Sequence, residues 1–571
     1  MYEGAPVSSV TTATTDRPTG KPAFSGELGI PMRDGVELAA DVYFPESSTL
    51  PAPVILTMTP YDKSVGFVLE EAKFYQARGY VYVVVDCRGR GKSEGEWRMA
   101  VHDGADGHDA VEWLARQSWS TGKIGTTGLS YLGWFQWATA AETPKHLTCM
   151  VSTSAAGRWQ REIPYTDGCF QLYCAWWVYM VRRRITEYYG LSQIDWETVL
   201  RMLPLESIGD LIKPSGRTWR DFMDHDTLDD HWKSVRFDDR YDRIDYPCLH
   251  VTGWYDLEDL VGAFHHYEHM TAMSPAKDKQ WLIAGPWSHG NSRNPKRVYA
   301  GIDFGEAAAP DMNDIHLRWF DYWLKGIDNG VTGEPKVKLW RGGLNEWVET
   351  DHWPLSTGTT SLYLSNEGDG ALTTKLAAGG EPRRFRYDPT DPVPTGIDVR
   401  KYPDEDPPIV LNGIEARADV LTYSTEPLET AVEISGWPHL ELFASSDCDD
   451  TEWHVRIADV APDGTSVKVC QGCRRASYRD SLEHPTPLTP GEIYRYDVEL
   501  WPVHHVFQPG HRVRALITSS DFPWFARSMN AFGPLKDLAD PRIATNTVLH
   551  GGDHASRLML PVMEGENDQH N

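Results

Sequence analysis

Short unbroken apolar runs, rather than alternating ones, mark the first third of the chain. Residues 53–58 and 80–85 form two such runs, and β-branched stretches of this kind are typical of strands covered on both faces. Residues 69–78 and 103–117 have the composition of helices, and residues 123–127 form a third short apolar run. This alternation of strands and helices predicts an α/β fold built on a parallel sheet.

The pattern changes twice further along the chain. Residues 155–235 contain many tryptophans but no strand-like runs, and we interpret them as an inserted helical cap. Strand-like runs return at residues 248–252 and 281–284, and a helix is predicted over residues 315–326. Beyond residue 345, many short strands separated by Pro, Gly and Asp turns predict a β-sandwich of jelly-roll type.

Composition and charge exclude several classes of partner. The chain has 571 residues, 55 basic and 82 acidic, giving a net charge of −27, and its densest basic run is only Arg182–Arg184. Nucleic acid and anionic membranes are therefore not expected as partners. No stretch reaches the ~20 apolar residues of a membrane span, and no signal peptide is visible. The eight cysteines are scattered, so we expect a cytoplasmic protein with reduced thiols.

The most informative segment is residues 126–137, in which a strand runs through a tight turn directly into a helix. A nucleophilic serine on such an elbow usually lies in G-x-S-x-G, because small neighbours let the chain turn and leave the hydroxyl above the sheet. Gly128 lies two positions before Ser130, but Leu132 replaces the second glycine and Gly133 follows it. Taken alone, this segment is equally compatible with an ordinary helix N-cap.

An acid and a histidine follow at the ends of later strands. Asp256 ends the segment after strand 248–252, and His289 lies in the loop after strand 281–284. Loops at the carboxyl ends of strands are where α/β folds place functional residues. Asp256 alone could be a helix cap and His289 a loop histidine. Serine, acid and histidine in this order, each at a strand end, predict a catalytic triad.

Several motifs resemble those of the bacterial cocaine-esterase-like hydrolases, the CocE/NonD family, which also contains α-amino-acid ester hydrolases and relatives of X-prolyl dipeptidyl peptidases. The resemblance extends from about residue 31 to about residue 561 and implies an α/β-hydrolase domain, a helical cap and a C-terminal jelly roll. The motifs that carry it are Gly128–Gly133, Gly253–Asp256, Gly285–His289, Asp86–Gly95, Trp319–Gly326 and His554–Pro561.

The hydrophobic pattern and the resemblance together predict four segments. Residues 1–22, rich in Ser, Thr and Pro, form a flexible N-terminal arm. The α/β-hydrolase catalytic domain comprises residues 23–154 and 236–345, interrupted by the helical cap at 155–235. Residues 346–571 form the jelly-roll β-sandwich.

Acyl-transfer chemistry assigns a role to each candidate catalytic residue. Ser130 attacks the substrate carbonyl, His289 takes the serine proton, and Asp256 orients the imidazole and stabilises its cationic form. The backbone N–H of Tyr131, the residue after the nucleophile, is the first expected oxyanion donor. The resemblance implies the hydroxyl of Tyr61 as the second donor, against the alternative of a packed loop tyrosine.

Two further carboxylates, Glu258 and Asp259, follow the triad acid. In α-amino-acid ester hydrolases, carboxylates at these offsets help to bind the substrate ammonium, so the resemblance implies an amine-binding site. Those enzymes also need a third carboxylate, for which Glu162 and Asp167 are the candidates here. The alternative for Glu258 and Asp259 is a pair of acids that face the N-terminus of a helix dipole.

The tryptophans near Ser130 and in the cap indicate the polarity of the substrate's acyl group. Trp134, Trp159 and Trp176 are candidate substrate contacts that favour an apolar or aromatic acyl group, although aromatic side chains are also common in protein cores. No metal or cofactor is expected. Cys470 and Cys473 have the spacing of half a zinc ribbon, but no second pair accompanies them.

We therefore expect a serine hydrolase that cleaves small-molecule carboxylic esters or amides through an acyl-enzyme. One alternative is an α-amino-acid ester hydrolase, or an aminopeptidase-like acylase or acyltransferase, that recognises a substrate amine. The other is a non-catalytic binding protein whose sandwich holds a ligand. A homo-oligomer is also compatible with the sequence, in which the arm of residues 1–22 wraps a neighbouring subunit.

Overall fold

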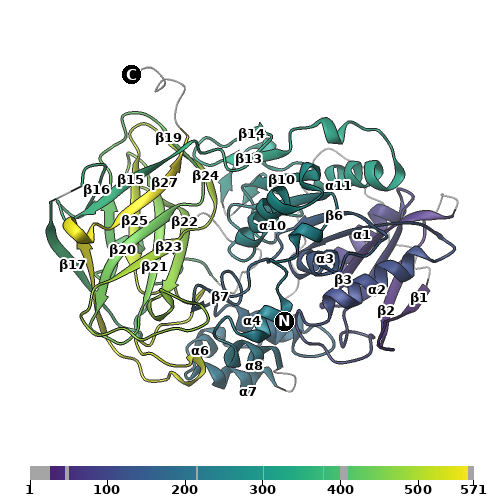
Figure 1. The fold of residues 1–571 in the computed structure, drawn as a ribbon, viewed down its shortest axis with the longest axis horizontal. Helices are drawn as coiled ribbons and strands as arrows, with labels where there is room; N and C mark the ends of the chain where they lie inside the picture. Colours follow the sequence, from purple (N-terminus) through teal and green to yellow (C-terminus); the bar gives the residue numbers. More distant parts are fainter. Residues whose placement is uncertain are drawn as a thin grey trace.

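Two bodies lie side by side in the molecule, and a group of short helices lies against both (Figure 1). The arm predicted for residues 1–22 lies outside the described residues. No helix in the described part of the chain is long and apolar enough to cross a membrane. The computed structural model describes residues 26–45, 50–213, 217–299, 301–376, 378–398 and 409–563.

The first body is built on a ten-stranded sheet with the order β1-β2-β4-β3-β5-β6-β9-β10-β13-β14. Its central strands, from β4 to β13 in this order, are parallel, and the edge strands β1, β2 and β14 are antiparallel to their neighbours. The strands are β1 Gly26–Pro31, β2 Glu37–Tyr43, β3 Ala52–Thr59, β4 Val81–Asp86, β5 Ser120–Leu129, β6 Leu147–Thr153, β9 Cys248–Gly253, β10 Gln280–Gly285, β13 Val337–Arg341 and β14 Glu346–Thr350.

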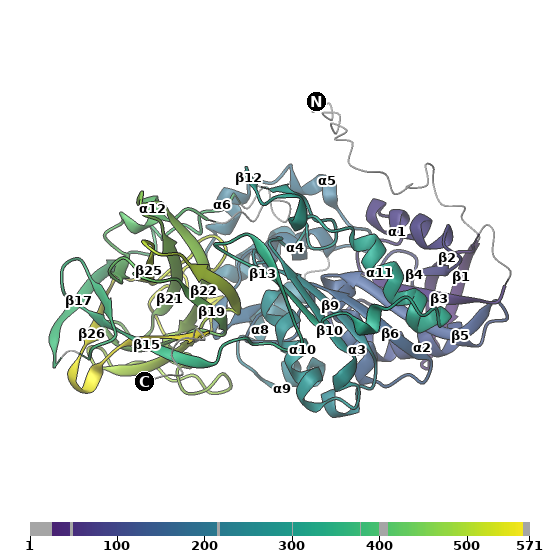
Figure 2. The ribbon, with the colours of Figure 1, turned by 90° about the horizontal axis from the view of Figure 1, so that it is seen from above.

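The unbroken apolar runs of the sequence are explained by helices on both faces of this sheet. In β4, Val81, Val83 and Val85 face one core, while Tyr82 and Val84 face the other. Helices α1 and α11 cover the second face, and α2, α3 and α10 cover the first (Figure 2). These helices are α1 Gly66–Gln76, α2 Asp103–Ala115, α3 Tyr131–Ala141, α10 Leu260–Met273 and α11 Met312–Phe320, the last continued by a π-helical turn at Asp321–Lys325.

The insert between β6 and β9 is helical, as predicted, and is held together by aromatic side chains. Trp219 and Phe222 are buried in it, and the ring of Trp232 stacks on that of Trp159 with the centroids 5.4 Å apart. Two very short strands, β7 Tyr165–Thr166 and β8 Cys169–Phe170, precede the helices. The helices are α4 Cys174–Val181, α5 Tyr188–Leu191, α6 Trp196–Leu200, α7 Ile208–Ile212, α8 Arg217–Asp224 and α9 Asp230–Val235.

The second body is the β-rich domain predicted for the C-terminal part, built almost entirely from antiparallel pairs around its own apolar core. In β20, Leu440, Leu442 and Ala444 alternate inward, which is the pattern of a strand with one covered face. Because β14 still pairs with β13 in the first sheet, the transition falls a few residues beyond the predicted 345. The strands are β15 Gly358–Ser365, β16 Ala371–Thr373, β17 Gly380–Tyr387, β18 Leu421–Ser424, β19 Val432–Gly436, β20 His439–Ser446, β21 Glu452–Val460, β22 Ser466–Arg475, β23 Tyr494–Glu499, β24 Val503–Phe507, β25 Arg512–Thr518, β26 Ala544–His550 and β27 Arg557–Val562.

The helical insert contacts both the α/β domain and the β-rich domain through its side chains. The ring of Tyr173 stacks on that of Trp524 in the β-rich domain, with the centroids 4.1 Å apart. On the other side, the indole of Trp177 reaches Tyr61 in the α/β domain. The apolar core of the α/β domain continues through the insert as far as Trp524. The insert is therefore packed as part of the core rather than as a loose flap.

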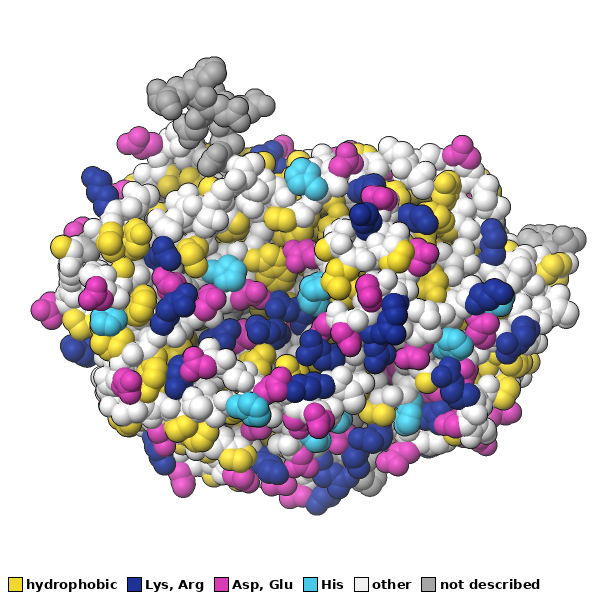
Figure 3. All heavy atoms as spheres, viewed as in Figure 1, with side chains coloured by type: hydrophobic (Ala, Val, Ile, Leu, Met, Phe, Trp, Pro, Cys, Tyr) yellow, Lys and Arg dark blue, Asp and Glu magenta, His cyan; other side chains and the backbone are white. Residues whose placement is uncertain are grey.

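Both signs of charge are mixed over the face seen in Figure 3, where lysines and arginines lie among aspartates and glutamates. Acidic and basic side chains are thus interspersed on this face.

Candidate active site

Four of the predicted site residues lie on loops at one edge of the parallel sheet. Tyr61 follows β3, Ser130 follows β5, Asp256 follows β9 and His289 follows β10. Parallel strands present their carboxyl ends at the same edge, so residues that are up to 228 positions apart in the sequence are brought together.

The chain turns sharply at Ser130, which has φ 66° and ψ −129°. A non-glycine residue in this region is strained, as expected for a serine raised on a strand-to-helix elbow. A Cβ at Gly128 would lie 2.4 Å from Cβ of Leu132, so the glycine makes room for the leucine. A Cβ at Gly133 would lie 2.8 Å from the carbonyl oxygen of Thr153. The glycine missing at the usual position is therefore replaced by one a position later, where α3 approaches β6.

The imidazole of His289 is held by the carboxylate of Asp256. Nδ1 lies 3.2 Å from each carboxylate oxygen. Oδ1 of the fully buried Asp256 also accepts the backbone N–H groups of Glu258 and Asp259, at 2.9 and 3.1 Å. Burial opposes ionisation of Asp256, but the charge of His289 and these hydrogen bonds keep the pKa of the carboxyl below its ordinary value. Asp256 is therefore an anion that fixes the ring.

Two more carboxylates surround the same imidazole. Glu258 Oε1 lies 3.8 Å from His289 Nε2, and Asp259 Oδ2 lies 3.9 Å from Nδ1. Burial raises the pKa of Glu258 to about 7 and raises that of Asp259 well above its ordinary value. Burial disfavours the imidazolium, but the carboxylates, Glu258 foremost, raise the pKa of His289. Asp259 occupies the N-cap of α10 without a side-chain cap hydrogen bond, so its carboxylate is not used to cap the helix.

Ser130 and His289 both line a cavity of about 1070 Å³. The hydrogen bonds of the described residues include none between the Ser130 hydroxyl and the imidazole; the serine instead has the hydroxyl of Tyr61 as a hydrogen-bonding neighbour. Catalytic hydrogen bonds are often long before substrate binds and tighten in the complex. The arrangement therefore brings the candidate nucleophile and base to one cavity without a hydrogen bond between their side chains.

The two predicted oxyanion donors, the Tyr61 hydroxyl and the Tyr131 backbone N–H, differ in their hydrogen-bond partners. Tyr61 Oη accepts a hydrogen bond from Trp177 Nε1 at 3.0 Å, and burial raises the pKa of Tyr61, so its proton remains available for donation. The hydroxyl of Tyr131 donates to Asp103 and accepts the backbone N–H of Ala100. Its backbone N–H opens α3, where no carbonyl of the same helix can accept it.

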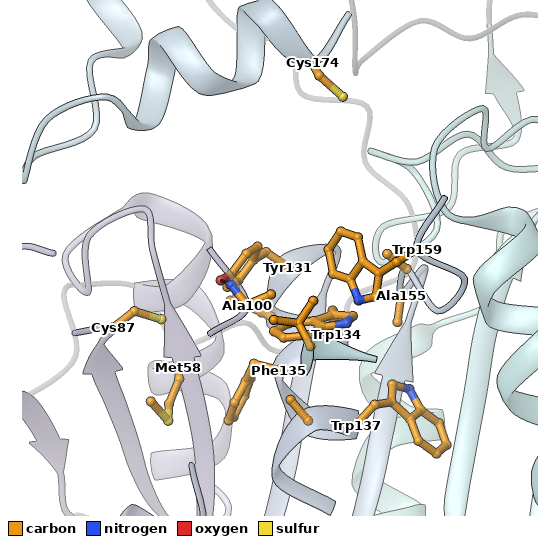
Figure 4. Close-up of a cluster of buried hydrophobic side chains, with 14 of the residues drawn as sticks. Met58, Cys87, Ala100, Tyr131, Trp134, Phe135, Trp137, Ala155, Trp159 and Cys174 are labelled. Carbon is orange, nitrogen blue, oxygen red and sulfur yellow. Dashed lines mark hydrogen bonds between the residues drawn. The ribbon is translucent and has the colours of Figure 1, made fainter. Parts of the chain in front are cut away.

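The candidate tryptophans line two separate spaces that both border Ser130. Trp134 and Trp159 line a small recess of about 30 Å³ beside the serine, and their rings meet edge to face with centroids 5.6 Å apart. Figure 4 shows these two rings next to each other, with Tyr131 beside Trp134. Trp176 lines the larger cavity instead. The recess is thus aromatic, and it also borders Glu258 and Asp259.

The proposed third carboxylate is not found in this recess. Glu162 is buried and accepts backbone N–H groups of Gly157, Arg158 and Gly262, and Asp167 pairs with arginines at 3.3 and 3.4 Å. Neither residue lines the cavity or the recess. A carboxylate that already accepts three N–H groups fixes the local backbone and has little capacity left for an ammonium group.

Two cap residues that the sequence analysis did not assign to the site also contact it. Trp177 donates to Tyr61, as described above, and Tyr173 Oη donates to Glu258 Oε2 at 3.2 Å. Both line the cavity and the recess. The sequence signal was the cluster of aromatic residues at the start of α4, but only the folded cap shows which of them face the α/β domain.

Family models match both bodies of the chain. Residues 34–291 match the X-Pro dipeptidyl-peptidase (S15 family) model. Residues 329–559 match the model of the X-Pro dipeptidyl-peptidase C-terminal non-catalytic domain.

Individual relatives cover almost the whole chain. A cocaine esterase from Rhodococcus sp. (strain MB1 Bresler) is 32% identical over 95% of this chain and 99% of its own. The structure of an α-amino acid ester hydrolase superposes with a TM-score of 0.83 and 26% identity, covering 97% of this chain and 100% of that one. An aminopeptidase from a marine sediment Thaumarchaeota archaeon has the same fold, with a TM-score of 0.85 and 24% identity over 98% of this chain and 99% of that one.

Proposed function

Because the chain belongs to the X-Pro dipeptidyl-peptidase (S15) and CocE/NonD family of serine hydrolases, we propose that it cleaves carboxylic esters or amides through an acyl-enzyme formed on Ser130. Membership of the family makes the protein an enzyme, which removes the alternative of a non-catalytic binding protein. The finer assignment rests on the residues at the sheet edge.

In the proposed mechanism, Ser130 Oγ attacks the carbonyl carbon while His289 Nε2 takes the hydroxyl proton. Asp256 stabilises the imidazolium that forms. Hydrogen bonds from the Tyr61 hydroxyl and the Tyr131 backbone N–H stabilise the negative charge that develops on the carbonyl oxygen. The tetrahedral intermediate collapses as His289 returns the proton to the leaving oxygen or nitrogen, and water then releases the acyl group by the same steps.

One observation carries this proposal: Ser130 and His289 line the same cavity, while Nδ1 of His289 is held by Asp256, which is fully buried and does not line that cavity. The recess beside Ser130 measures only about 30 Å³, about the volume of one water molecule, so it has room for little of an acyl group. The larger cavity, which Trp176 lines, has room for both the acyl and the leaving group. Acyl transfer to an amine would use the same acyl-enzyme and remains part of the proposal.

Covalent labelling tests the nucleophile directly. A fluorophosphonate should add one label per chain to the wild-type protein, at Ser130 by peptide mass spectrometry, and no label to Ser130→Ala. Ser64→Ala is the matched control, because Ser64 lines the same cavity but its hydroxyl donates to Asp62 at 2.7 Å. Labelling of Ser130→Ala, or loss of labelling in Ser64→Ala alone, would contradict the assignment.

A second candidate function, hydrolysis of α-amino-acid esters, is favoured by the position of Glu258 and Asp259. Both border the recess beside Ser130; Asp259 is buried and Glu258 is about 10% exposed, and a substrate ammonium would compensate the charge of either carboxylate. The displacement of Glu162 from the recess weakens the analogy, since two carboxylates rather than three face the substrate. The wild-type kcat/KM for an amino ester and its desamino analogue decides the question: equal values would remove the idea.

A further inference from the structure

A second cluster of reactive side chains lies where the cap meets the β-rich domain, away from the active-site cavity. It joins Cys169 from β8 with Glu452 and His454 from β21, and one ligand-type atom of each lies within 4.8 Å of those of the others. The three residues are 0, 2 and 2% exposed. His454 Nε2 lies 2.9 Å from Glu452 Oε2. None of the three lines the cavity or the recess at Ser130.

A second thiol adjoins this cluster. Cys473 on β22 lies directly opposite His454 in the strand pairing and is a hydrogen-bonding neighbour of Cys169. Its partner in the C-x-x-C spacing, Cys470, lies in the apolar core of the β-rich domain instead. The sequence spacing is therefore not what assembles the cluster, because residues three apart on a strand point to opposite faces.

Thiolate, imidazole and carboxylate are all zinc ligands, and closed tetrahedral sites are made mainly of cysteine and histidine, which are three of the four residues here. Zinc–ligand distances of about 2.0–2.3 Å place neighbouring donors of such a site about 3.3–3.8 Å apart. The donors of Cys169, Glu452 and His454 are within an ångström or so of that spacing. Sulfur and imidazole ligands also select zinc over the hard cations magnesium and calcium.

We propose that Cys169, Glu452 and His454 bind one zinc ion that ties the cap to the β-rich domain. Cys473, whose Sγ donates to the carbonyl of Thr166 in this structure, lies outside the group of atoms within 4.8 Å and would turn in as the fourth ligand. Four protein donors leave no open position for water, so the site is structural rather than catalytic. On binding, zinc replaces the protons of the thiols and of the imidazolium, and these protons are released to solvent. No oxidant or reductant takes part, because the ion stays divalent.

The surroundings explain why an ion would be retained there. The edge of Phe525 packs on the ring of His454, with centroids 5.2 Å apart, and closes the site to water. Cys169, Glu452, His454 and Cys473 are each at most 2% exposed. A divalent cation would compensate these buried donor atoms, and binding it would release their protons.

Metal analysis of the full chain tests the proposal. Protein produced with added zinc and purified without chelator should contain about one zinc per chain. Cys169→Ser and His454→Gln should lose it, whereas Cys470→Ser, the matched buried thiol on β22, should keep it. Cobalt(II) loaded in place of zinc should give a thiolate-to-cobalt charge-transfer absorption in the wild type and in Cys470→Ser only.

The cobalt spectrum also separates this site from the active site. Glu258, Asp259 and His289 form the other metal-competent group of the described residues, but it contains no sulfur and cannot produce the thiolate band. If the variants do not fold, as judged by ester turnover, the wild-type spectrum alone decides. Wild-type protein with no zinc and no thiolate band, or with a Cys169–Cys473 disulfide detected by mass spectrometry, would overturn the proposal.

Discussion

Among the buried histidines of the described residues, His289 and His454 are the two whose pKa is raised by acidic neighbours, and they differ in what can reach them. His289 meets Asp256 at 3.2 Å and has Glu258 and Asp259 near its ring nitrogens, at the wall of a cavity of about 1070 Å³. His454 meets Glu452 at 2.9 Å and borders no cavity described for the active site.

The comparison shows that a buried histidine with a raised pKa is not by itself evidence of catalysis. In both clusters, neighbouring acidic groups raise the pKa of the histidine against the effect of burial. Of the two, only His289 lines the cavity that Ser130, the proposed nucleophile, also lines. We therefore propose catalysis for the cluster that a substrate can reach and a role in stability for the other.

Changing the carboxylate partner of His289 should have the largest effect. Asp256→Asn keeps the shape of the side chain but removes the charge that stabilises the imidazolium, so we expect kcat to fall by about 10⁴-fold. The thermal midpoint should change little, because the backbone hydrogen bonds to the side-chain oxygen survive. Steady-state kinetics measure kcat, and calorimetry measures the thermal midpoint. A loss of less than tenfold in kcat would mean that Asp256 does not stabilise the imidazolium of His289.

Removal of one oxyanion donor should have the next largest effect. Tyr61→Phe deletes only the hydroxyl, and the expected loss in kcat is about 10²–10³-fold with a smaller change in KM. Tyr188→Phe is the control, since Tyr188 lines the same cavity and has no assigned role in the chemistry. The same kcat for Tyr61→Phe and the wild type would show that another group donates the hydrogen bond to the oxyanion.

The same kind of change in the second cluster should affect stability rather than turnover. Glu452→Gln leaves the buried His454 without its anionic partner and should lower the free energy of unfolding by about 3 kcal/mol. The kcat of the folded variant should stay within about twofold of the wild type. Denaturation and ester kinetics measured on one preparation test this; a large loss of kcat at full stability would erase the distinction between the two clusters.

The smallest expected effect is a pH-dependent preference for amines at the first cluster. Because burial raises the pKa of Glu258 to about 7, the carboxyl is neutral below this pH and anionic above it. An α-amine itself titrates at about 7.7–8.0, so the test uses an ester with an α-trimethylammonium group, which keeps its charge at every pH. Its KM, relative to that of an uncharged analogue, should therefore fall by up to about tenfold as the pH rises from about 6 to about 8. Taking the ratio cancels the titration of His289, which acts on both substrates.

Glu258→Gln provides the control for that ratio. A neutral amide cannot change its charge in this range, so the ratio should become nearly independent of pH. A ratio that is flat in the wild type, or that keeps its slope in Glu258→Gln, would assign the preference to another group or remove it.

Local sequence was enough to predict the α/β sheet, the helical insert and the β-rich C-terminal part, because each has its own hydrophobic period. The parallel strands appeared as unbroken runs, and β20 as an alternating one. The loops after β5, β9 and β10 could also be recognised, since the residues at a strand end are contiguous in sequence. Their convergence followed from the rule that parallel strands end at one edge.

Only the tertiary structure shows which side chains of the insert and of the β-rich domain lie near His289 and which lie near His454. Glu162 was a candidate for the amine site by position, but its carboxylate accepts backbone N–H groups instead. Cys470 and Cys473 had a metal-like spacing, yet only Cys473 faces Cys169, 304 positions earlier in the chain. Such contacts join elements with no local relation in sequence, and they are fixed by how the separate faces pack against one another.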